Sequence, residues 1–280
     1  MDKKTKKTII AIVVILLIVV DLGVMLYPKI SAYVNSQSQT RAVVQYFDDV
    51  EAAGAENMKK LLEEAREYNK GLLKNANRFN MSDEEKAEYN RQLDAGRGVI
   101  GTLVIDKIEV KLPIYHGTNE SVLQIGLGHM AGTSLPVGGA GTHAFISGHR
   151  GLPSSTLLTD LDRMEIGDKF VLYVMGETLT YQVDDIQTVE PHEVDALDID
   201  PDKDYCTLVT CTPYGINTHR LLVRGQRIAN DSNGWDAMYM EARLLDKTKV
   251  ILAAIILLAP VLIVYSIIRS RKINKGGIVQ

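Results

Sequence analysis

Residues 205–215 read Tyr205-Cys206-Thr207-Leu208-Val209-Thr210-Cys211-Thr212-Pro213-Tyr214-Gly215. The β-branched and apolar residues up to Cys211 predict a strand, and the Pro and Gly that follow predict a loop. Because side chains alternate along a strand, Cys206 and Cys211 point to opposite faces about 16 Å apart and cannot form a disulfide. We expect Cys206 to be a small apolar core residue. Cys211 lies at the strand end beside a loop, where nucleophiles are often displayed.

Similar runs flank this strand on both sides, each short, rich in β-branched residues and bounded by Gly, Pro, Asn or Asp. They are residues 101–105, 111–115, 143–147, 170–174, 178–183 and 220–227. About seven or eight strands over roughly 130 residues, with few helices between them, predict a mainly β domain. The pattern indicates a sandwich or a small barrel over residues 98–228. Residues 229–249, which follow, are interpreted as a linker.

The two ends of the chain are apolar. The 280 residues include 24% charged side chains, yet the mean hydropathy of -0.01 is high for such a composition. Residues 9–27 follow a basic tip (1–8), and residues 250–268 precede a basic tail (269–280). A helix of about 20 residues spans a membrane, so we expect two transmembrane helices, with both termini cytoplasmic and the part between them exoplasmic. For the first segment the alternative is a cleaved signal peptide, but no convincing cleavage site follows it, and we expect an uncleaved anchor.

A helical segment is predicted before the β domain, over residues 28–97. Apolar residues recur at spacings of three and four over residues 41–73, with a break at Gly54 between two helices. A capping box at Ser82 begins a second, short helix that runs to about Leu93. We interpret these helices as packing on the β domain or spacing it from the membrane. A partner-binding coil is the alternative.

Composition excludes several classes of function. The 31 basic and 35 acidic side chains give a net charge of -4. Residues 1–8 carry +3 and residues 269–280 carry +4, which leaves -11 on the part between them. That acidic balance disfavours nucleic acid as a partner. Two cysteines support neither a disulfide framework nor a four-cysteine zinc site, and residues 138–141 lack the Lys and Ser/Thr of a phosphate loop. We therefore expect no cofactor and no metal.

A cysteine nucleophile needs a partner that makes its thiolate and handles protons. His149 stands between glycines at the end of a predicted strand, and His219 follows the loop after Cys211. Position in the sequence leaves both histidines open. The loop predicts an antiparallel hairpin in which Cys211 and Arg220 lie nearly opposite, so the guanidinium of Arg220 can stabilise an oxyanion. Arg224, farther along the strand, suits a structural role. The other histidines suit surface or core roles: His116, His129, His143 and His192.

Several motifs, in order along residues 101–228, resemble the sortase family. The most specific is Thr207-Leu208-Val209-Thr210-Cys211-Thr212-Pro213-Tyr214-Gly215, followed by Asn217-Thr218-His219-Arg220. Others are Leu112-Pro113-Ile114-Tyr115-His116-Gly117-Thr118, Gly132-Thr133-Ser134-Leu135-Pro136-Val137-Gly138-Gly139 and Ile146-Ser147-Gly148-His149-Arg150-Gly151-Leu152. The resemblance implies an eight-stranded β-barrel with Cys211 as nucleophile, His149 as proton-transfer partner and Arg220 as the oxyanion or substrate-positioning group. The last apolar segment and the loop after Cys211 resemble the pilus-assembling class C.

This resemblance implies a membrane-anchored cysteine transpeptidase. Such an enzyme cleaves an LPXTG-like sorting signal between Thr and Gly through a thioester, and a pilin lysine amine then resolves the thioester. The implied partners are pilin or surface-protein precursors exported across a Gram-positive cell membrane. A cell-wall-anchoring sortase, which uses a peptidoglycan-precursor amine, is the nearest alternative. Two other readings are a papain-like hydrolase, which expects its cysteine at a helix start with the histidine downstream, and a non-catalytic binding module.

One feature departs from the resemblance. Pilus sortases often carry a lid before the barrel, with an Asp-Pro-aromatic triplet that plugs the site. Residues 74–97 are the possible lid region here, but the only Asp-Pro of the chain is Asp200-Pro201. Residues 79–83 (Phe-Asn-Met-Ser-Asp) occupy about the right place without matching. We therefore assign no lid residues. Asp106 also stands where the family pattern has Pro, without an expected catalytic consequence.

Overall fold

A computed structural model describes residues 3–191, 193, 197–230, 234–235 and 238, with the backbone alone for residues 3–16, 18, 19 and 22. Within this described part, no helix combines the length and the hydropathy needed to cross a membrane. The expected second span, residues 250–268, and the basic tail lie outside the described residues, as does most of the linker. The expected first span, residues 9–27, is helical.

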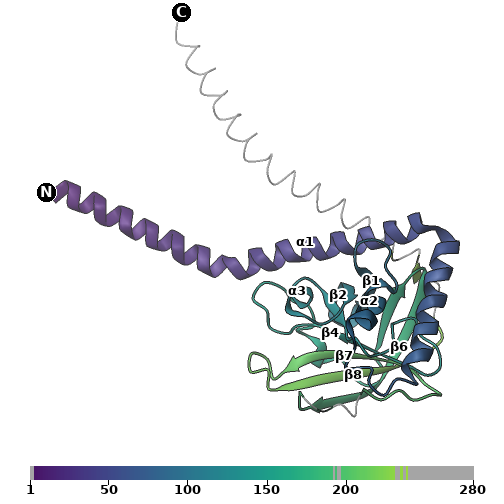
Figure 1. Ribbon diagram of the computed structural model, residues 1–280. Coiled ribbons are helices and arrows are strands. Elements are labelled where there is room, and N and C mark those ends of the chain that lie inside the picture. The colour runs from purple at the N-terminus through teal and green to yellow at the C-terminus, as the bar shows by residue number, and fades with distance from the viewer. Residues whose placement is uncertain (1–2, 192, 194–196, 231–233, 236–237, 239–280) are drawn as a thin grey trace, which may run out of the picture. The chain divides into compact units, whose positions relative to one another are not determined.

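Helices α1 and α2 precede the barrel, eight strands form it, and short helical segments lie in the connections between the strands (Figure 1). The helical elements are α1 (Lys3–Leu72), α2 (Asp83–Arg91), η1 (Asp106–Ile108), α3 (Glu120–Leu123) and η2 (Leu161–Arg163). The strands are β1 (Val99–Ile105), β2 (Val110–His116), β3 (Leu127–His129), β4 (Thr142–Ser147), β5 (Lys169–Val174), β6 (Glu177–Val189), β7 (Asp204–Thr212) and β8 (His219–Arg227). Every predicted strand is present. Strand β3 was missed, because three residues, one of them Gly128, show no alternation.

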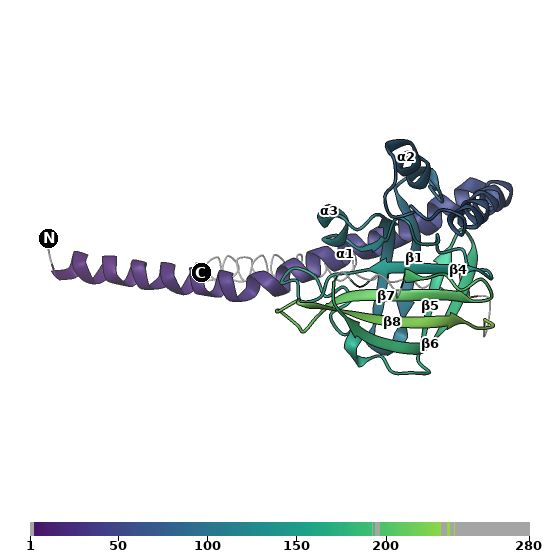
Figure 2. The ribbon, with the colours of Figure 1, turned by 60° about the horizontal axis from the view of Figure 1, so that its bottom comes forward.

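The strands close into a barrel in the order β1-β2-β3-β4-β7-β8-β6-β5. This result confirms a barrel over the sandwich alternative. Strand β7 is parallel to β4 on one side and antiparallel to β8 on the other, and Figure 2 shows β7 and β8 side by side. The β4–β7 pairing therefore brings the carboxyl ends of two strands to one end of the barrel. The β7–β8 hairpin brings the start of β8 to the same end.

The barrel interior is packed with side chains. Every residue of β1 is buried, and the largest fully buried side chains include Phe145, Phe170 and Tyr181. Phe170 and Tyr181 stack with ring centroids 5.4 Å apart. A Cβ at Gly225 would lie 2.6 Å from the Phe170 ring, so β8 needs glycine to pass these two rings. Close packing of this kind leaves the ends of the barrel as the places for a site.

Helix α1 packs on the barrel, as the packing interpretation predicts. It kinks at Gly54, whose φ of 77° and ψ of 157° are non-helical, which confirms the predicted break. Before the kink, Tyr46 and Phe47 are buried, and the Tyr46 hydroxyl donates to the Ile100 carbonyl at 3.2 Å. After the kink, the Asn69 side chain exchanges two hydrogen bonds with the Leu135 backbone, at 3.0 and 2.8 Å. Both parts of the helix are thus anchored to the barrel.

Helix α2 begins with the predicted capping box. The Ser82 hydroxyl accepts from the Glu85 amide at 3.2 Å, and the Glu85 carboxylate accepts from the Ser82 amide at 2.7 Å. The helix ends at Arg91, two residues before the expected end. Its Tyr89 is buried, and the hydroxyl contacts Nδ1 of His129 at 2.9 Å. This contact seats α2 on β3.

Candidate active site

Cys211 lies at the exposed end of β7, and Cys206 lies in the core. Cys206 has no exposed surface, and burial raises the pKa of its thiol well above the usual value. A thiol held in the protonated form is a poor nucleophile. Cys211 is half-buried, and neither cysteine is in a disulfide. The assignment of Cys206 to the core is confirmed. The papain-like alternative is wrong, because Cys211 lies on a strand.

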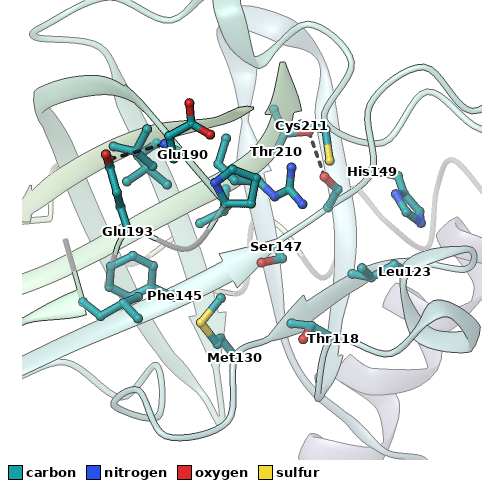
Figure 3. Close-up of a pocket in the computed structure, with 17 residues that line it drawn as sticks. Thr118, Leu123, Met130, Phe145, Ser147, His149, Glu190, Glu193, Thr210 and Cys211 are labelled. Atoms are coloured by element: carbon teal, nitrogen blue, oxygen red, sulfur yellow. Dashed lines mark hydrogen bonds between the residues drawn. The ribbon is translucent and has the colours of Figure 1, made fainter. Parts of the chain in front are cut away.

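The parallel pairing of β4 with β7 brings His149 to Cys211. Ser147 is in register with Val209, and two hydrogen bonds extend the pairing beyond the end of β4. The Gly148 amide donates to the Val209 carbonyl at 3.0 Å, and the Thr210 hydroxyl donates to the Gly148 carbonyl at 2.8 Å. His149 therefore begins its loop beside the end of β7. Figure 3 shows Cys211 and His149 on the same side of the cavity.

Arg220 completes this end of the barrel from β8. It lies directly across the ladder from Cys211, as the hairpin prediction requires. Its Nη1 donates to the backbone carbonyls of Asn217 and His219, at 3.3 and 3.1 Å. These contacts hold the guanidinium at the mouth of the hairpin. Its charge there can stabilise a negative oxygen that forms near Cys211.

The side chains of Cys211, His149 and Arg220 line one cavity of about 410 Å³. Apolar side chains pack together at its inner wall: Met130, Phe145, Val189, Leu197, Val209 and Leu222. Glu190 and Glu193 lie across the cavity from His149 (Figure 3). The arrangement combines a thiol, an imidazole and a guanidinium at the edge of an apolar groove. Such a site can perform acyl transfer on a peptide.

His219, the histidine that the sequence left open beside His149, contacts a residue of the cavity wall but does not line the cavity. Its Nε2 lies 3.3 Å from a carboxylate oxygen of Glu190, and its Nδ1 contacts the Thr218 hydroxyl at 2.9 Å. It is not among the side chains that line the cavity. Of the two candidates, His149 is the one that lines the same cavity as Cys211.

Arg224 and the buried histidines have structural roles in the described part of the chain. Arg224 forms a paired contact with Asp184, at 3.1 and 2.9 Å, and stacks on Tyr205, which confirms its structural role. Burial lowers the pKa of His129 and of His143 to about 4, so both are neutral core residues. His192 lies outside the described residues. Among the residues that the structure describes, no group of three His, Cys, Asp or Glu could hold a metal ion.

Sequence reasoning missed one contact in the site. Glu120, the first residue of α3, places its Oε2 3.3 Å from Nε2 of His149. The two residues are far apart in the sequence, and no motif connects them. Their contact depends on the loop between β2 and β3, which leads into the strand that was not predicted.

The possible lid region lies outside the cavity. All of residues 74–97 are described, and none of them lines it. Arg78 donates to the carbonyl of Leu197 at 2.8 Å, and its guanidinium lies over the Phe79 ring. Leu197 is part of the cavity wall. This region therefore contacts a residue of the cavity wall without lining the cavity itself.

Comparison with known proteins agrees with this arrangement. The Sortase domain family model matches residues 103–228. Sortase C1 from Streptococcus agalactiae is 49% identical in its solved structure, with a TM-score of 0.66, and the match covers 68% of this chain and 100% of that one. The solved sortase C from Streptococcus pneumoniae is 40% identical, with a TM-score of 0.62, over 68% of this chain and 97% of that one.

A curated relative is matched over a shorter range. Sortase A of Streptococcus agalactiae is 34% identical over 131 residues, which are 46% of this chain and 52% of the relative. The chain therefore spans about half the length of that protein. The two solved structures described above, which it covers in full or nearly so, are a sortase C1 and a sortase C. With the matched domain extending over the barrel and its site, the chain belongs to the sortase family of cysteine transpeptidases.

Proposed function

We propose that this protein is a membrane-anchored sortase that polymerises pilins. It cleaves an LPXTG-like sorting signal between Thr and Gly and joins the new acyl end to a lysine amine of a pilin. The observation that carries the proposal is the convergence of Cys211, His149 and Arg220 on one apolar cavity. Cys211 is the nucleophile, His149 transfers protons, and Arg220 stabilises the oxyanion.

The first half-reaction forms a thioester. The Cys211 thiolate attacks the carbonyl carbon of the substrate threonine, and negative charge develops on the carbonyl oxygen. Arg220, opposite Cys211 in the ladder, stabilises that charge. The C–N bond then breaks, and the leaving glycine amine takes a proton from the imidazolium of His149. The products are the Cys211 thioester, neutral His149 and the carboxyl-terminal part of the signal.

The second half-reaction uses an amine in place of the one that left. The neutral lysine amine attacks the thioester carbon and gives a proton to His149. The C–S bond breaks and the thiolate leaves, so an isopeptide bond forms and the thiolate–imidazolium pair is restored. No cofactor is needed for either step. The same three side chains serve both halves of the reaction.

The cavity suits the apolar part of a sorting signal. Its inner wall consists of Leu, Val, Phe and Met side chains, which can bury the Leu and Pro of the motif. Cys211 lies at the edge of this wall, so a chain seated on the wall can present its next residues to the thiol. This fit supports an LPXTG-like signal as the substrate class.

Two comparisons support a pilin as the acceptor. The solved structures that this chain resembles include the sortase C of Streptococcus pneumoniae, whose description concerns pilin substrate specificity. They also include the sortase C1 of a Streptococcus agalactiae pilus island. The exoplasmic location is supported by the apolar segments 9–27 and 250–268 with their basic outer flanks.

The test uses the full-length protein in membranes, with a purified pilin that carries its sorting signal. We expect covalent pilin ladders, together with a thioester on Cys211 that mass spectrometry detects. The Cys211→Ala variant should give neither. A thioester without ladders, resolved only by a peptidoglycan-precursor amine, would identify a cell-wall-anchoring sortase instead. Absence of any thioester would overturn the transpeptidase proposal.

A further inference from the structure

Glu120 holds the catalytic imidazole from the side of α3. Its Oε2 lies 3.3 Å from Nε2 of His149, and its Oε1 accepts a hydrogen bond from Nε2 of Gln124 at 3.0 Å. Asn119 caps the short helix by accepting from the Val122 amide at 3.1 Å. Both carboxylate oxygens therefore have a partner, and the backbone that carries Glu120 is itself fixed.

The helix α3 belongs to the rim of the cavity. Thr118, just before it, and Leu123, its last residue, line the same cavity as His149 and Cys211. The His149 side chain is only 22% exposed, whereas that of Glu120 is 66% exposed. The carboxylate thus covers the outer edge of the ring while it remains in contact with solvent. It contacts Nε2, and Nδ1 is the ring nitrogen that this contact leaves available.

His149 is surrounded by groups of both charges. Arg220 approaches from β8, and Arg150 follows on the loop of His149 itself, so both neighbours are cations. Cys211 faces the ring from β7, and Glu190 and Glu193 lie across the cavity (Figure 3). Cations disfavour an imidazolium, and a carboxylate in contact favours it. Asp162 already pairs with Arg150, and in the described part of the chain Glu120 is the carboxylate in contact with the imidazole itself.

We propose that Glu120 is a positioning residue for the sortase reaction, which orients His149 and favours its protonated form. This inference rests on the proposed function, because the imidazolium matters there as the proton donor to the leaving amine. By favouring the imidazolium, Glu120 also favours the Cys211 thiolate paired with it. The effect is moderate, since solvent screens a carboxylate that is two-thirds exposed.

Two measurements on the full-length protein test the proposal. The first is the rate at which Cys211 is acylated by an LPXTG peptide in a single turnover. The second is the pH dependence of Cys211 alkylation by iodoacetamide, which involves no substrate; buried Cys206 does not compete. Glu120→Gln should slow acylation about fivefold. It should also move the midpoint of alkylation upward by about half a pH unit.

Matched variants separate a positioning role from a structural one. Glu120→Asp keeps the charge with a shorter side chain, so it should retain most of the alkylation midpoint. Glu63→Gln removes an exposed carboxylate from α1, and it should behave as wild type in both measurements. A Glu120→Gln protein with the rate and midpoint of Glu63→Gln would overturn the proposal, whatever its melting temperature. A wild-type protein that is alkylated but forms no thioester would overturn the proposed function, while the alkylation comparison still decides the role of Glu120.

Discussion

Cys211 and Arg220 lie directly opposite each other in the β7–β8 ladder, close to the turn of the hairpin. The distance between their backbones is therefore set by the sheet itself rather than by a flexible loop. His149 reaches the same place through a different pairing, that of β4 with β7. Two ladders that share β7 thus bring Cys211, His149 and Arg220 to the same end of the barrel.

Replacing Arg220 should affect the chemical step far more than folding. Arg220→Ala removes the charge that faces the developing oxyanion, so we expect acylation by a sorting peptide to slow about 100-fold. Arg224→Lys is the matched control on the same face of β8. It loses the stacking on Tyr205 and should cost about 1 kcal/mol of stability with little change in rate. Equal loss of rate in both variants would contradict the role of Arg220.

Substitutions of the two cysteines should have different effects, one on catalysis and the other on stability. Cys211→Ala removes the nucleophile and should abolish thioester formation, as followed by mass spectrometry after incubation with a sorting peptide. Cys206→Ala leaves a small cavity in the core and should lower the unfolding free energy by about 1 kcal/mol, with near-normal turnover. Urea unfolding measures that cost. Loss of thioester formation in Cys206→Ala, in a protein that is still folded, would contradict the assignment of the nucleophile.

The contacts of Arg150 should stabilise the loop that carries His149 and the segment after Cys211. Its side chain is only 9% exposed, it pairs with Asp162, and its guanidinium lies 5.9 Å from the centre of the Tyr214 ring. Arg150→Met should reduce both the unfolding free energy, by about 2 kcal/mol, and the acylation rate. Arg163→Met is the control, because its side chain is 69% exposed in a surface pair. If Arg150→Met acylates as fast as Arg163→Met, the two loops do not depend on this contact.

Local patterns predicted most of the strands and one half of the site. The hairpin that joins Cys211 to Arg220 is encoded within a few residues, so the sequence alone indicated their juxtaposition. The pairing of His149 with Cys211 joins strands about sixty residues apart in the chain, and the residues by themselves left His219 as an equal candidate. Only the resemblance to sortases selected His149. Glu120 had no signal in the sequence, because its contact arises from tertiary packing of a four-residue helix.

The stability of the barrel should fall as the pH falls below about 6.5, because two histidines are buried in neutral form. Burial lowers the pKa of His129 and of His143 to about 4. In the unfolded chain these residues take up protons near pH 6.5, so between pH 6.5 and 4 protons bind preferentially to the unfolded state. Each histidine should thereby cost about 2 kcal/mol on going from pH 7 to pH 4.5. Burial raises the pKa of Asp204, which contributes a change of stability with the opposite sign. Urea unfolding of the wild type and of His143→Gln at both pH values measures the effect, and equal slopes for the two proteins would refute it.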